Sequence, residues 1–243
     1  MAKDLLLEIG TEEVPAHFMP GILAQLKEKA TAKFQEMRLD FDEVTTLGTP
    51  RRTALLVKNL AETQQGASSE YKGPSTAIAF DKDGNPTKAA IGFARGKKVD
   101  VADLVVKDGY VYAVSSEEGK QTVELLPTLL KELVEGLNFP KNMRWGDLDF
   151  RFVRPLRWLV ALYDEEVIDF TVANVTSGRV SRGHRFLSEG DFTINKASDY
   201  EQACKDAFII VDQEKRRDII KAQIEEIAKA HNGHAEITED LLE

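Results

Sequence analysis

The stretch Asp4-Leu5-Leu6-Leu7-Glu8-Ile9 near the start of the chain decides the fold. An apolar run this short predicts a buried β-strand, even though Glu8 interrupts it. Pro15 follows six residues later, after a mostly polar stretch, and suits the first turn of a helix. From residue 16 to residue 37, apolar side chains recur at every fourth position and predict an amphipathic helix. These side chains are Phe18, Ile22, Leu26, Ala30 and Phe34.

Apolar spacing and turn residues predict the remaining elements. Thr87 is the expected N-cap of a short helix that ends at Gly96, and the polar residues 61–76 predict a loop. Because strands and helices mix without a regular βαβ period, the predicted fold class is α+β, with mixed or antiparallel sheets and packed helices. Further helices are expected at 122–137, 196–207 and 213–231. Strands are expected at 43–48, 52–60, 110–114, 149–153, 157–163, 166–175 and 180–185.

The composition is that of an acidic chain with enough apolar residues for a core. Of its 243 residues, 42% are hydrophobic, and the formal net charge is −9. Nucleic acid would repel such a chain as a whole, so RNA contact requires a local basic surface. The single cysteine, Cys204, excludes an internal disulfide and suits a reducing compartment. No apolar run approaches the roughly 20 residues that span a bilayer, so we expect a cytoplasmic protein without membrane contact.

Two windows and one turn concentrate positive charge. Residues 141–157 hold five basic and two acidic side chains, and residues 176–186 hold three arginines, one histidine and no acid. Pro50 displays the two arginines that follow it in a turn. Arginine suits phosphate because its planar fork donates two parallel hydrogen bonds. The candidate RNA-binding or assembly residues are Arg51, Arg52, Lys141, Arg144, Trp145, Arg151, Arg154, Arg157, Arg179, Arg182, His184 and Arg185.

A structural interpretation of the same residues stays open. The arginines can pair with neighbouring Asp and Glu, and Trp145 and Trp158 can belong to the core instead of stacking on a base. The two interpretations differ in what mutation does. An RNA surface predicts binding that falls steeply with salt, whereas a structural network predicts a loss of stability.

Other reactive side chains do not assemble into a catalytic or metal site. Glu8, Glu12 and Glu13 could do acid–base work or hold magnesium, but nothing else completes such a site. The dipole of the following helix already favours acids there, and the arginines are alternative partners. His231 and His234 flank a turn and lack a nearby cysteine. We therefore predict no catalytic residue and no metal site, and Cys204 is expected to be buried and inert.

Five segments together resemble the N-terminal region of the β subunit of bacterial two-subunit glycyl-tRNA synthetases. Each match is modest, but their order and spacing cover nearly the whole chain. Val14 departs from the leucine that the family often has, and Ser181 from its threonine. The segments are residues 6–16, Gly48-Thr49-Pro50-Arg51-Arg52, residues 72–95, residues 139–146 with 152–158, and Ser181-Arg182-Gly183-His184-Arg185-Phe186.

The resemblance implies a division of labour within a glycine–tRNA ligase, an α2β2 heterotetramer. The α subunit holds the aminoacylation site with its ATP and Mg²⁺, and the β subunit contacts tRNA(Gly). The implied partners of this chain are the α subunit, tRNA(Gly) and a second β subunit. Residues 1–195 would form a B3/B4-like α+β module. Residues 196–243 would begin a helical, HD-like domain that is truncated here.

Three functional hypotheses follow. The first is a non-catalytic module of the ligase that contacts tRNA and supports assembly. The second is a hydrolytic editing domain, since the related phenylalanyl module edits. Against it, glycine is the smallest amino acid, and a pocket that glycine fills excludes every larger one. The third is a scaffold that only docks the α subunit, in which case apolar surface would matter more than the arginines.

Overall fold

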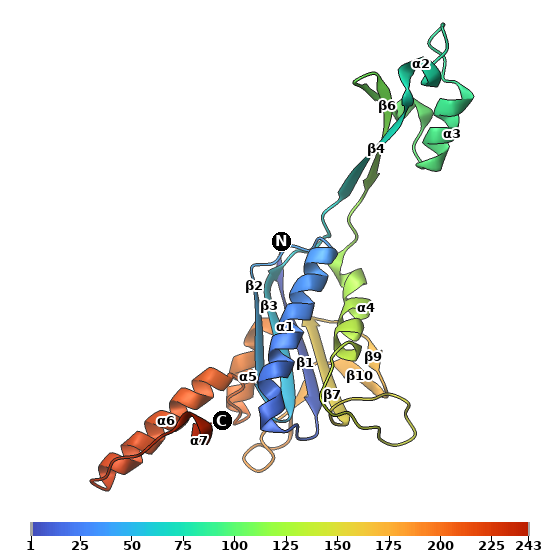
Figure 1. The fold of residues 1–243 in the computed structure, drawn as a ribbon. Helices are drawn as coiled ribbons and strands as arrows, with labels where there is room; N and C mark the ends of the chain where they lie inside the picture. The colour runs from blue at the N-terminus through green and yellow to red at the C-terminus, as the bar shows by residue number, and fades with distance from the viewer. Residues whose placement is uncertain (1, 243) are drawn as a thin grey trace. The chain divides into compact units, whose positions relative to one another are not determined.

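The computed structural model describes residues 2–242 and divides them into two compact units (Figure 1). Unit 2 is Gln64–Lys120, and unit 1 is the remainder of the described chain. The α+β class predicted from the sequence is confirmed, but the insertion of unit 2 into unit 1 was not predicted. The boundary predicted at residue 195 stays a prediction.

Unit 1 is built on a seven-stranded sheet in the order β2-β3-β1-β7-β10-β9, with β8 paired to β7. At its centre, β1 (Lys3–Thr11) pairs antiparallel with β3 (Arg52–Leu60) and with β7 (Leu156–Tyr163). A strand that has neighbours at both edges and elements on both faces is buried throughout, which explains its continuous apolar run. The predicted buried strand is therefore confirmed, and it extends beyond both ends of the predicted range.

The outer strands of unit 1 correct several predictions. The strand predicted at 166–175 is confirmed only in part, because β8, β9 and the start of β10 lie within it as separate short strands. Residues 168–170 and a turn at 173–174 interrupt them, and Ala173 in that turn adopts a left-handed conformation with φ of 55°. The strand predicted at 149–153 is wrong. Phe152 is buried in the core and makes only an isolated bridge to Met143. The observed strands are β2 (Glu43–Thr49), β8 (Glu166–Val167), β9 (Thr171–Val172), β10 (Val175–Gly178), β11 (Val180–Arg182) and β12 (Asp191–Thr193).

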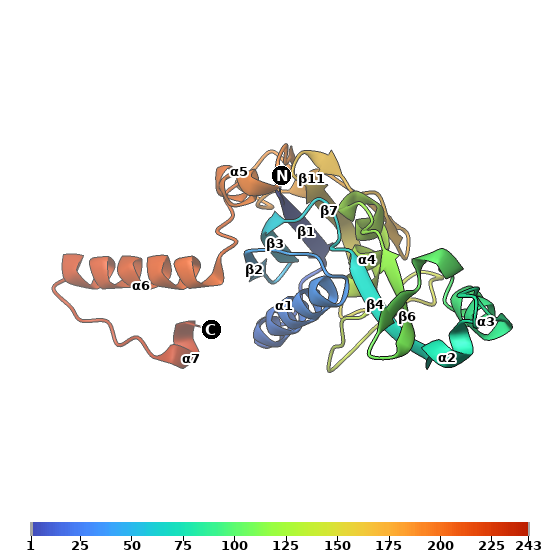
Figure 2. The ribbon, with the colours of Figure 1, turned by 90° about the horizontal axis from the view of Figure 1, so that it is seen from above.

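Two layers of structure cover the two faces of the sheet of unit 1 (Figure 2). On one face, α1 (Met19–Glu36) and α4 (Thr122–Glu135) bury their apolar stripes against Leu5, Leu7 and Ile9 of β1. On the other face, Leu6 of β1 packs in a second core with α5 (Tyr200–Asp206). The helices predicted at 16–37, 122–137 and 196–207 are confirmed. Two 3₁₀ turns precede α1 and α5, η1 (Ala16–Phe18) and η3 (Ala197–Asp199).

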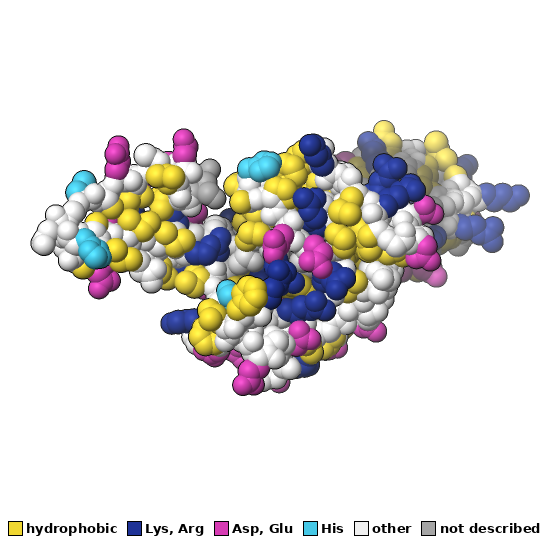
Figure 3. All heavy atoms as spheres, turned by 90° about the horizontal axis from the view of Figure 1, so that it is seen from below, with side chains coloured by type: hydrophobic (Ala, Val, Ile, Leu, Met, Phe, Trp, Pro, Cys, Tyr) yellow, Lys and Arg dark blue, Asp and Glu magenta, His cyan; other side chains and the backbone are white. Residues whose placement is uncertain are grey.

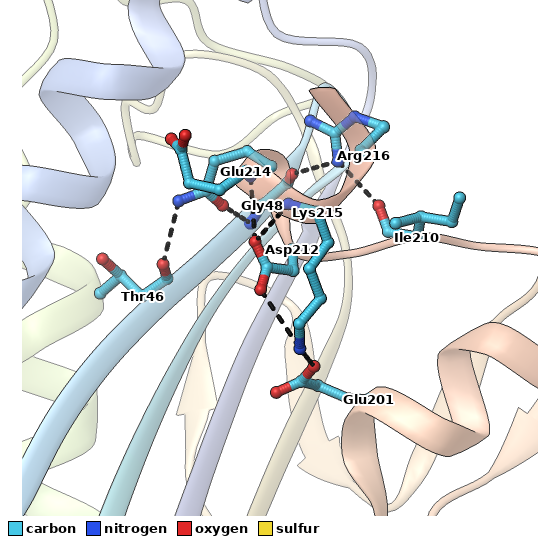
Figure 4. A network of polar contacts seen from close by, with 9 residues as sticks. Thr46, Gly48, Glu201, Ile210, Asp212, Glu214, Lys215 and Arg216 are labelled. Carbon is cyan, nitrogen blue, oxygen red and sulfur yellow. Dashed lines mark hydrogen bonds and ion pairs between the residues drawn. The ribbon is translucent and has the colours of Figure 1, made fainter. Parts of the chain in front are cut away.

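Helix α6 (Gln213–Ala230) is anchored at its first turn (Figure 4). Asp212 caps the helix by accepting hydrogen bonds from the backbone N–H groups of Glu214 and Lys215. Arg216 donates to the carbonyl of Gly48 in β2 at 3.1 Å and to the carbonyl of Ile210 at 2.7 Å. The predicted helix is confirmed, but no residue of α6 is buried, so its isoleucine stripe stays exposed. The short helix α7 (Glu239–Leu242) follows.

Unit 2 consists of a three-stranded sheet in the order β4-β6-β5 with two short helices on one face. The loop predicted at 61–76 is wrong over most of its length, because its polar residues form β4 and pair with β6, more than 30 residues away along the chain. Thr87 precedes α3 as predicted, but its hydroxyl donates to the carbonyl of Ile78 and does not cap the helix. The elements are β4 (Ala67–Ser75), α2 (Thr76–Ala79), α3 (Lys88–Gly96), η2 (Val101–Asp103), β5 (Val105–Lys107) and β6 (Tyr110–Glu117).

Within residues 2–242, no helix is both long enough and apolar enough to cross a bilayer.

The contact between Gly10 and Trp158 gives a first test of the sheet. The two residues are paired across β1 and β7, and a Cβ atom on Gly10 would lie 2.0 Å from atoms of the indole ring. We expect Gly10→Ala to lower the free energy of unfolding by about 1–3 kcal/mol, since overpacking displaces the buried ring. Urea denaturation measures this loss.

Gly21→Ala is the matched control, because a Cβ atom on Gly21 meets nothing within 4 Å. Alanine favours a helix over glycine, so the control should be neutral or slightly more stable. Equal destabilisation by the two substitutions would contradict the contact with Trp158.

Candidate nucleic-acid interface

The candidate interface lies at one end of the sheet of unit 1. Because β1 runs antiparallel to β3 and β7, its end at Thr11 meets the start of β3 at Arg52 and the start of β7. Backbone hydrogen bonds fasten these segments together. The N–H of Thr11 donates to the carbonyl of Arg51 at 2.9 Å, and that of Glu12 to the carbonyl of Pro155 at 3.1 Å. Segments far apart in the sequence therefore form one surface.

A buried carboxylate organises this end of the sheet from within. Glu8 of β1 is fully buried and accepts hydrogen bonds from the hydroxyls of Ser181 and Tyr200, both at 2.5 Å, and from the indole N–H of Trp158. Its carboxylate also lies 3.6 Å from Nη1 of Arg52, which is 3% exposed. A buried charge is tolerated only when it is paired and hydrogen-bonded, and Glu8 meets both conditions.

Arg52 is a buried partner of Glu8 and not a surface residue. Burial alone would lower the pKa of Arg52, but the charge of Glu8 leaves this pKa above its ordinary value. The guanidinium also donates to the carbonyl of Arg182 at 2.5 Å. Arg52 is a candidate for RNA contact in the sequence. In the structure it is buried beneath the interface and stabilises the fold.

The indole of Trp158 supports three arginines. The guanidinium carbons of Arg51, Arg52 and Arg182 lie 5.8, 5.5 and 5.2 Å from a ring centroid of Trp158, within the range of cation–π attraction. The ring itself is 6% exposed, so it belongs to the core. Attraction to this ring offsets part of the mutual repulsion of the three guanidinium groups.

Partly exposed arginines form the outer layer of the interface. Arg157 pairs with Glu12 at 3.1 Å, and Arg185 pairs with Glu13 at 3.4 Å. The two glutamates thus act as partners for arginines, one of the roles considered for them from the sequence. Arg154 donates to the backbone carbonyl of Glu13 at 3.0 Å. Seen from below in Figure 3, Lys and Arg side chains gather on this end with a few acidic side chains among them.

A cleft of about 460 Å³ opens beside these arginines. Arg51 lines it, and among the described residues no partner hydrogen-bonds its buried Nε. Burial, followed by the positive charge of Arg185, lowers the pKa of Arg51. Four arginines but only one acidic residue, Glu13, line the cleft, so positive charge is in excess here, and such a site attracts an anion. The other lining residues are Glu13, Thr49, Pro50, Arg52, Gly183, His184, Arg185, Phe186, Phe208, Ile209, Ile210 and Arg216.

Two exposed phenylalanines stand at the cleft. Phe186 is 84% exposed and Phe208 is 58% exposed, although large aromatic side chains are normally covered. Next to Phe186, Nδ1 of His184 accepts the backbone N–H groups of Phe186 and Leu187, both at 3.2 Å. His184 thus fixes the loop that presents Phe186. Aromatic faces beside arginines suit unpaired bases attached to phosphates.

Several candidate residues lie outside the cleft. Lys141 and Arg151 are exposed, and Arg144 pairs with Asp149 at 3.3 Å. Trp145 packs against the first core and meets Phe150 edge-on at 5.9 Å between centroids, which favours its structural interpretation. Arg179 donates to the backbone carbonyls of Glu165 and Asn195, so it braces two turns. At this end of the sheet the structure brings together Arg51, Arg52, Arg154, Arg157, Arg182, His184 and Arg185. Of these, Arg51, Arg52, His184 and Arg185 line the cleft.

Sequence reasoning missed Arg216, Phe186 and Phe208 as lining residues. Arg216 comes from a helix that was interpreted through its apolar stripe, and only the fold brings its first turn to β2. Phe186 could have been found, because it ends the conspicuous basic segment and interrupts its polar character. Phe208 has a left-handed backbone with φ of 60°, which no sequence pattern signals.

Glu8 and Glu12 provide a test of the buried pair. We expect Glu8→Gln to lower the free energy of unfolding by about 3–5 kcal/mol, because Arg52 is left buried without its counter-charge. The matched control is Glu12→Gln, whose partner Arg157 has a side chain 47% exposed. An exposed pair contributes less than about 1 kcal/mol. Urea denaturation of both variants compares the losses, and similar values would refute the organising role of Glu8.

Cys204 provides a test of burial on the second face. Burial, assisted by the charge of Glu8, raises the pKa of Cys204 to about 12 from an ordinary value of 9.0. The folded chain thus keeps the thiol proton that the unfolded chain loses, so this group disfavours the folded state as pH rises above 9. At pH 8 we expect a thiol reagent such as Ellman's reagent to modify Cys204 only after unfolding in guanidinium. Rapid modification of the native chain would contradict the burial.

The described part of the chain contains no candidate metal-binding site. No three His, Cys, Asp or Glu side chains within residues 2–242 lie close enough together to hold an ion. His231 is exposed at the end of α6, and His234 is exposed beyond it.

Comparison with known proteins identifies the family. Residues 5–243 match the family described as "Glycyl-tRNA synthetase beta subunit". The chain is 50% identical over 247 aligned residues to the "Glycine--tRNA ligase beta subunit" of Desulfitobacterium hafniense (strain Y51), and 47% identical to the protein of that name from Citrifermentans bemidjiense. Each alignment covers 100% of this chain and 36% of the relative, so the chain spans about a third of their length. The resemblance noted in the sequence is thereby confirmed, and the chain belongs to the glycyl-tRNA synthetase β-subunit family.

Proposed function

We propose that this chain contacts tRNA(Gly) through its arginine-lined cleft and supports assembly of a glycine–tRNA ligase. The aminoacylation site, with ATP and Mg²⁺, would belong to the α subunit. In this proposal the chain acts in the cytoplasm within an α2β2 heterotetramer, with the α subunit and a second β subunit as partners. Residues 1–195 would form the B3/B4-like module, and residues 196–243 would begin an HD-like domain.

The cleft carries this proposal. Its single strongest support is the incompletely paired charge of Arg51 beside Arg185, on a chain whose net charge is −9. An acidic chain gains nothing in solubility from concentrating arginines, whereas RNA phosphates would supply the missing counter-charge. The ion pairs at the rim are partly exposed and therefore weak, so phosphate can replace Glu13 as the partner of Arg185.

Aromatic side chains at the cleft favour RNA over a small anion. Phe186 and Phe208 line the same cleft as Arg51 and expose much of their rings. A small anion such as sulfate would leave these rings in water. A nucleotide would cover them by stacking while its phosphate met the arginines.

A pair of matched arginines tests the proposed function. The side chains of Arg185 and Arg144 are each 52% exposed and each pairs with a carboxylate, at 3.4 and 3.3 Å, but only Arg185 lines the cleft. We expect Arg185→Ala to weaken binding of tRNA(Gly) and to reduce the slope of log Kd against log salt by about 1. Fluorescence anisotropy between about 50 and 200 mM salt measures both quantities.

Arg144→Ala should leave the affinity and the slope at the wild-type values. The proposal fails if tRNA binding by the wild-type chain is insensitive to salt, or if both substitutions reduce it equally. A stability measurement on each variant separates a lost phosphate contact from partial unfolding.

A further inference from the structure

The sheet of unit 2 is covered on one face only within that unit. Val111 and Ala113 of the central strand β6 are fully buried, and Val111 packs with Ala79 of α2 and Ala90 of α3. Side chains alternate between the two faces of a strand, so Tyr110, Tyr112 and Val114 point to the opposite face. There Tyr110 is 38% exposed and Val114 is 40% exposed.

Pairing across the sheet identifies the neighbours of the two tyrosines. Tyr112 lies opposite Lys72 of β4 and Val105 of β5, and Tyr110 lies opposite Lys107 of β5. Paired residues share a face. The ammonium group of Lys72 lies 3.6 Å from the ring centroid of Tyr110, and that of Lys107 lies 5.9 Å from the ring centroid of Tyr112. We call this surface the tyrosine face and define it by Tyr110, Tyr112, Lys72 and Lys107.

We propose that the tyrosine face binds unpaired nucleotides of RNA. An aromatic ring stacks on any base, since every base has a flat π-face, and a lysine beside the ring neutralises the attached phosphate. The ammonium of Lys72 lies over the Tyr110 ring and that of Lys107 near the Tyr112 ring, so a base that stacks on Tyr110 displaces the Lys72 ammonium from that ring face toward the attached phosphate. The face therefore provides two stacking positions, each with its own cation.

The spacing of the tyrosines selects single strands over duplexes. Two residues on the same face of a strand, such as Tyr110 and Tyr112, are about 7 Å apart along it, twice the rise of about 3.3 Å per residue. Successive bases in a helical stack are only about 3.4 Å apart. Two tyrosines at this spacing can each receive a base only when the bases are unstacked from each other, as they are in loops and ends.

The lysines also distinguish RNA from a protein partner. Tyrosine is enriched at protein interfaces, but lysine is depleted from them because its burial removes a strongly hydrated charge. On this face, lysines contact the very rings that a protein partner would cover. Glu70 lies on the same face and pairs with Lys107 at 3.8 Å, an exposed contact that phosphate can displace.

This inference concerns a unit other than the one that holds the arginine cleft. The cleft variant Arg185→Ala should not affect it, so the two proposals can fail separately. The RNA chemistry also differs, because the cleft depends on phosphate contacts by arginine and the tyrosine face depends mainly on stacking.

Fluorescence anisotropy tests the tyrosine face. It measures the affinity of the full chain for a short, fluorescently labelled single-stranded RNA. We expect the double variant Tyr110→Ala/Tyr112→Ala to bind at least about tenfold more weakly, since each stacked base contributes strongly to affinity. The variant Tyr110→Phe/Tyr112→Phe should bind like the wild type, because stacking requires only the ring. The matched control is Tyr71→Ala. Tyr71 is 39% exposed and pairs with Ala113, so it lies on the opposite face.

Crosslinking to the wild-type chain provides a second test, which does not depend on whether the alanine substitutions disturb the sheet of unit 2. An RNA that contains 4-thiouridine should crosslink to residues 105–114 of the wild-type chain, and a duplex RNA should not. Unchanged affinity of the double alanine variant, or crosslinks found only outside unit 2, would overturn the proposal. So would loss of binding to the purified α subunit with RNA affinity intact, since the face would then be a protein surface.

Discussion

The buried carboxylate of Glu8 is the interaction on which the arrangement of unit 1 depends. It lies on the central strand and connects residues of four other elements, Arg52 of β3, Trp158 of β7, Ser181 of β11 and Tyr200 of α5. Removing a charge from water is costly, and this cost is offset only while every partner is in place. The network therefore specifies one arrangement of β3, β7, β11 and α5, because any other leaves a buried charge unpaired.

This internal network also determines what the surface can do. Arg52 and Trp158 are fixed by Glu8, and Trp158 in turn holds Arg51 and Arg182 by cation–π contact. Arginines on flexible loops would spread apart to lower their repulsion. Here the fold keeps them close, and burial of Arg51 prevents water from screening its charge fully. The fold thus keeps positive charge concentrated at the cleft, where the proposed RNA phosphate would bind.

The periodic parts of the fold could be predicted from the sequence, since their signals are local. The apolar run of β1 predicts a strand and the four-residue spacing in α1 predicts a helix, each without reference to the rest of the chain. The strand β4 could not be predicted in this way. Its residues are polar and its stability comes from pairing with β6, which only the three-dimensional fold brings near. The strand prediction for residues 149–153 failed for the opposite reason. Phe152 and Val153 are apolar because they pack in the core, and they do not belong to a sheet.

The sequence could predict that the candidate site is rich in arginine, but not which arginines belong to it. Charge counts located the arginines, yet the sequence could not separate Arg52 from Arg51, adjacent residues with opposite surroundings. Both line the cleft, but Arg52 is buried against Glu8, which lies 44 positions away in the chain, whereas Arg51 is only partly buried. Likewise Arg179 and Arg182 lie three residues apart, but one braces backbone turns and the other stands over Trp158.

The two units apply the same pair of residue types, cations and aromatics, in different ways. In unit 1 the aromatic ring of Trp158 is buried and positions arginines, so the charges are the part offered to a ligand. In unit 2 the rings of Tyr110 and Tyr112 lie on the sheet face opposite its two helices, with Lys72 over one ring and Lys107 near the other, and the further inference assigns the ligand contact to the rings. Arginine phosphate contacts give affinity that salt removes, whereas stacking depends much less on salt. Under the two proposals made above, this chain would hold RNA by charge at the cleft and select unpaired nucleotides at the tyrosine face.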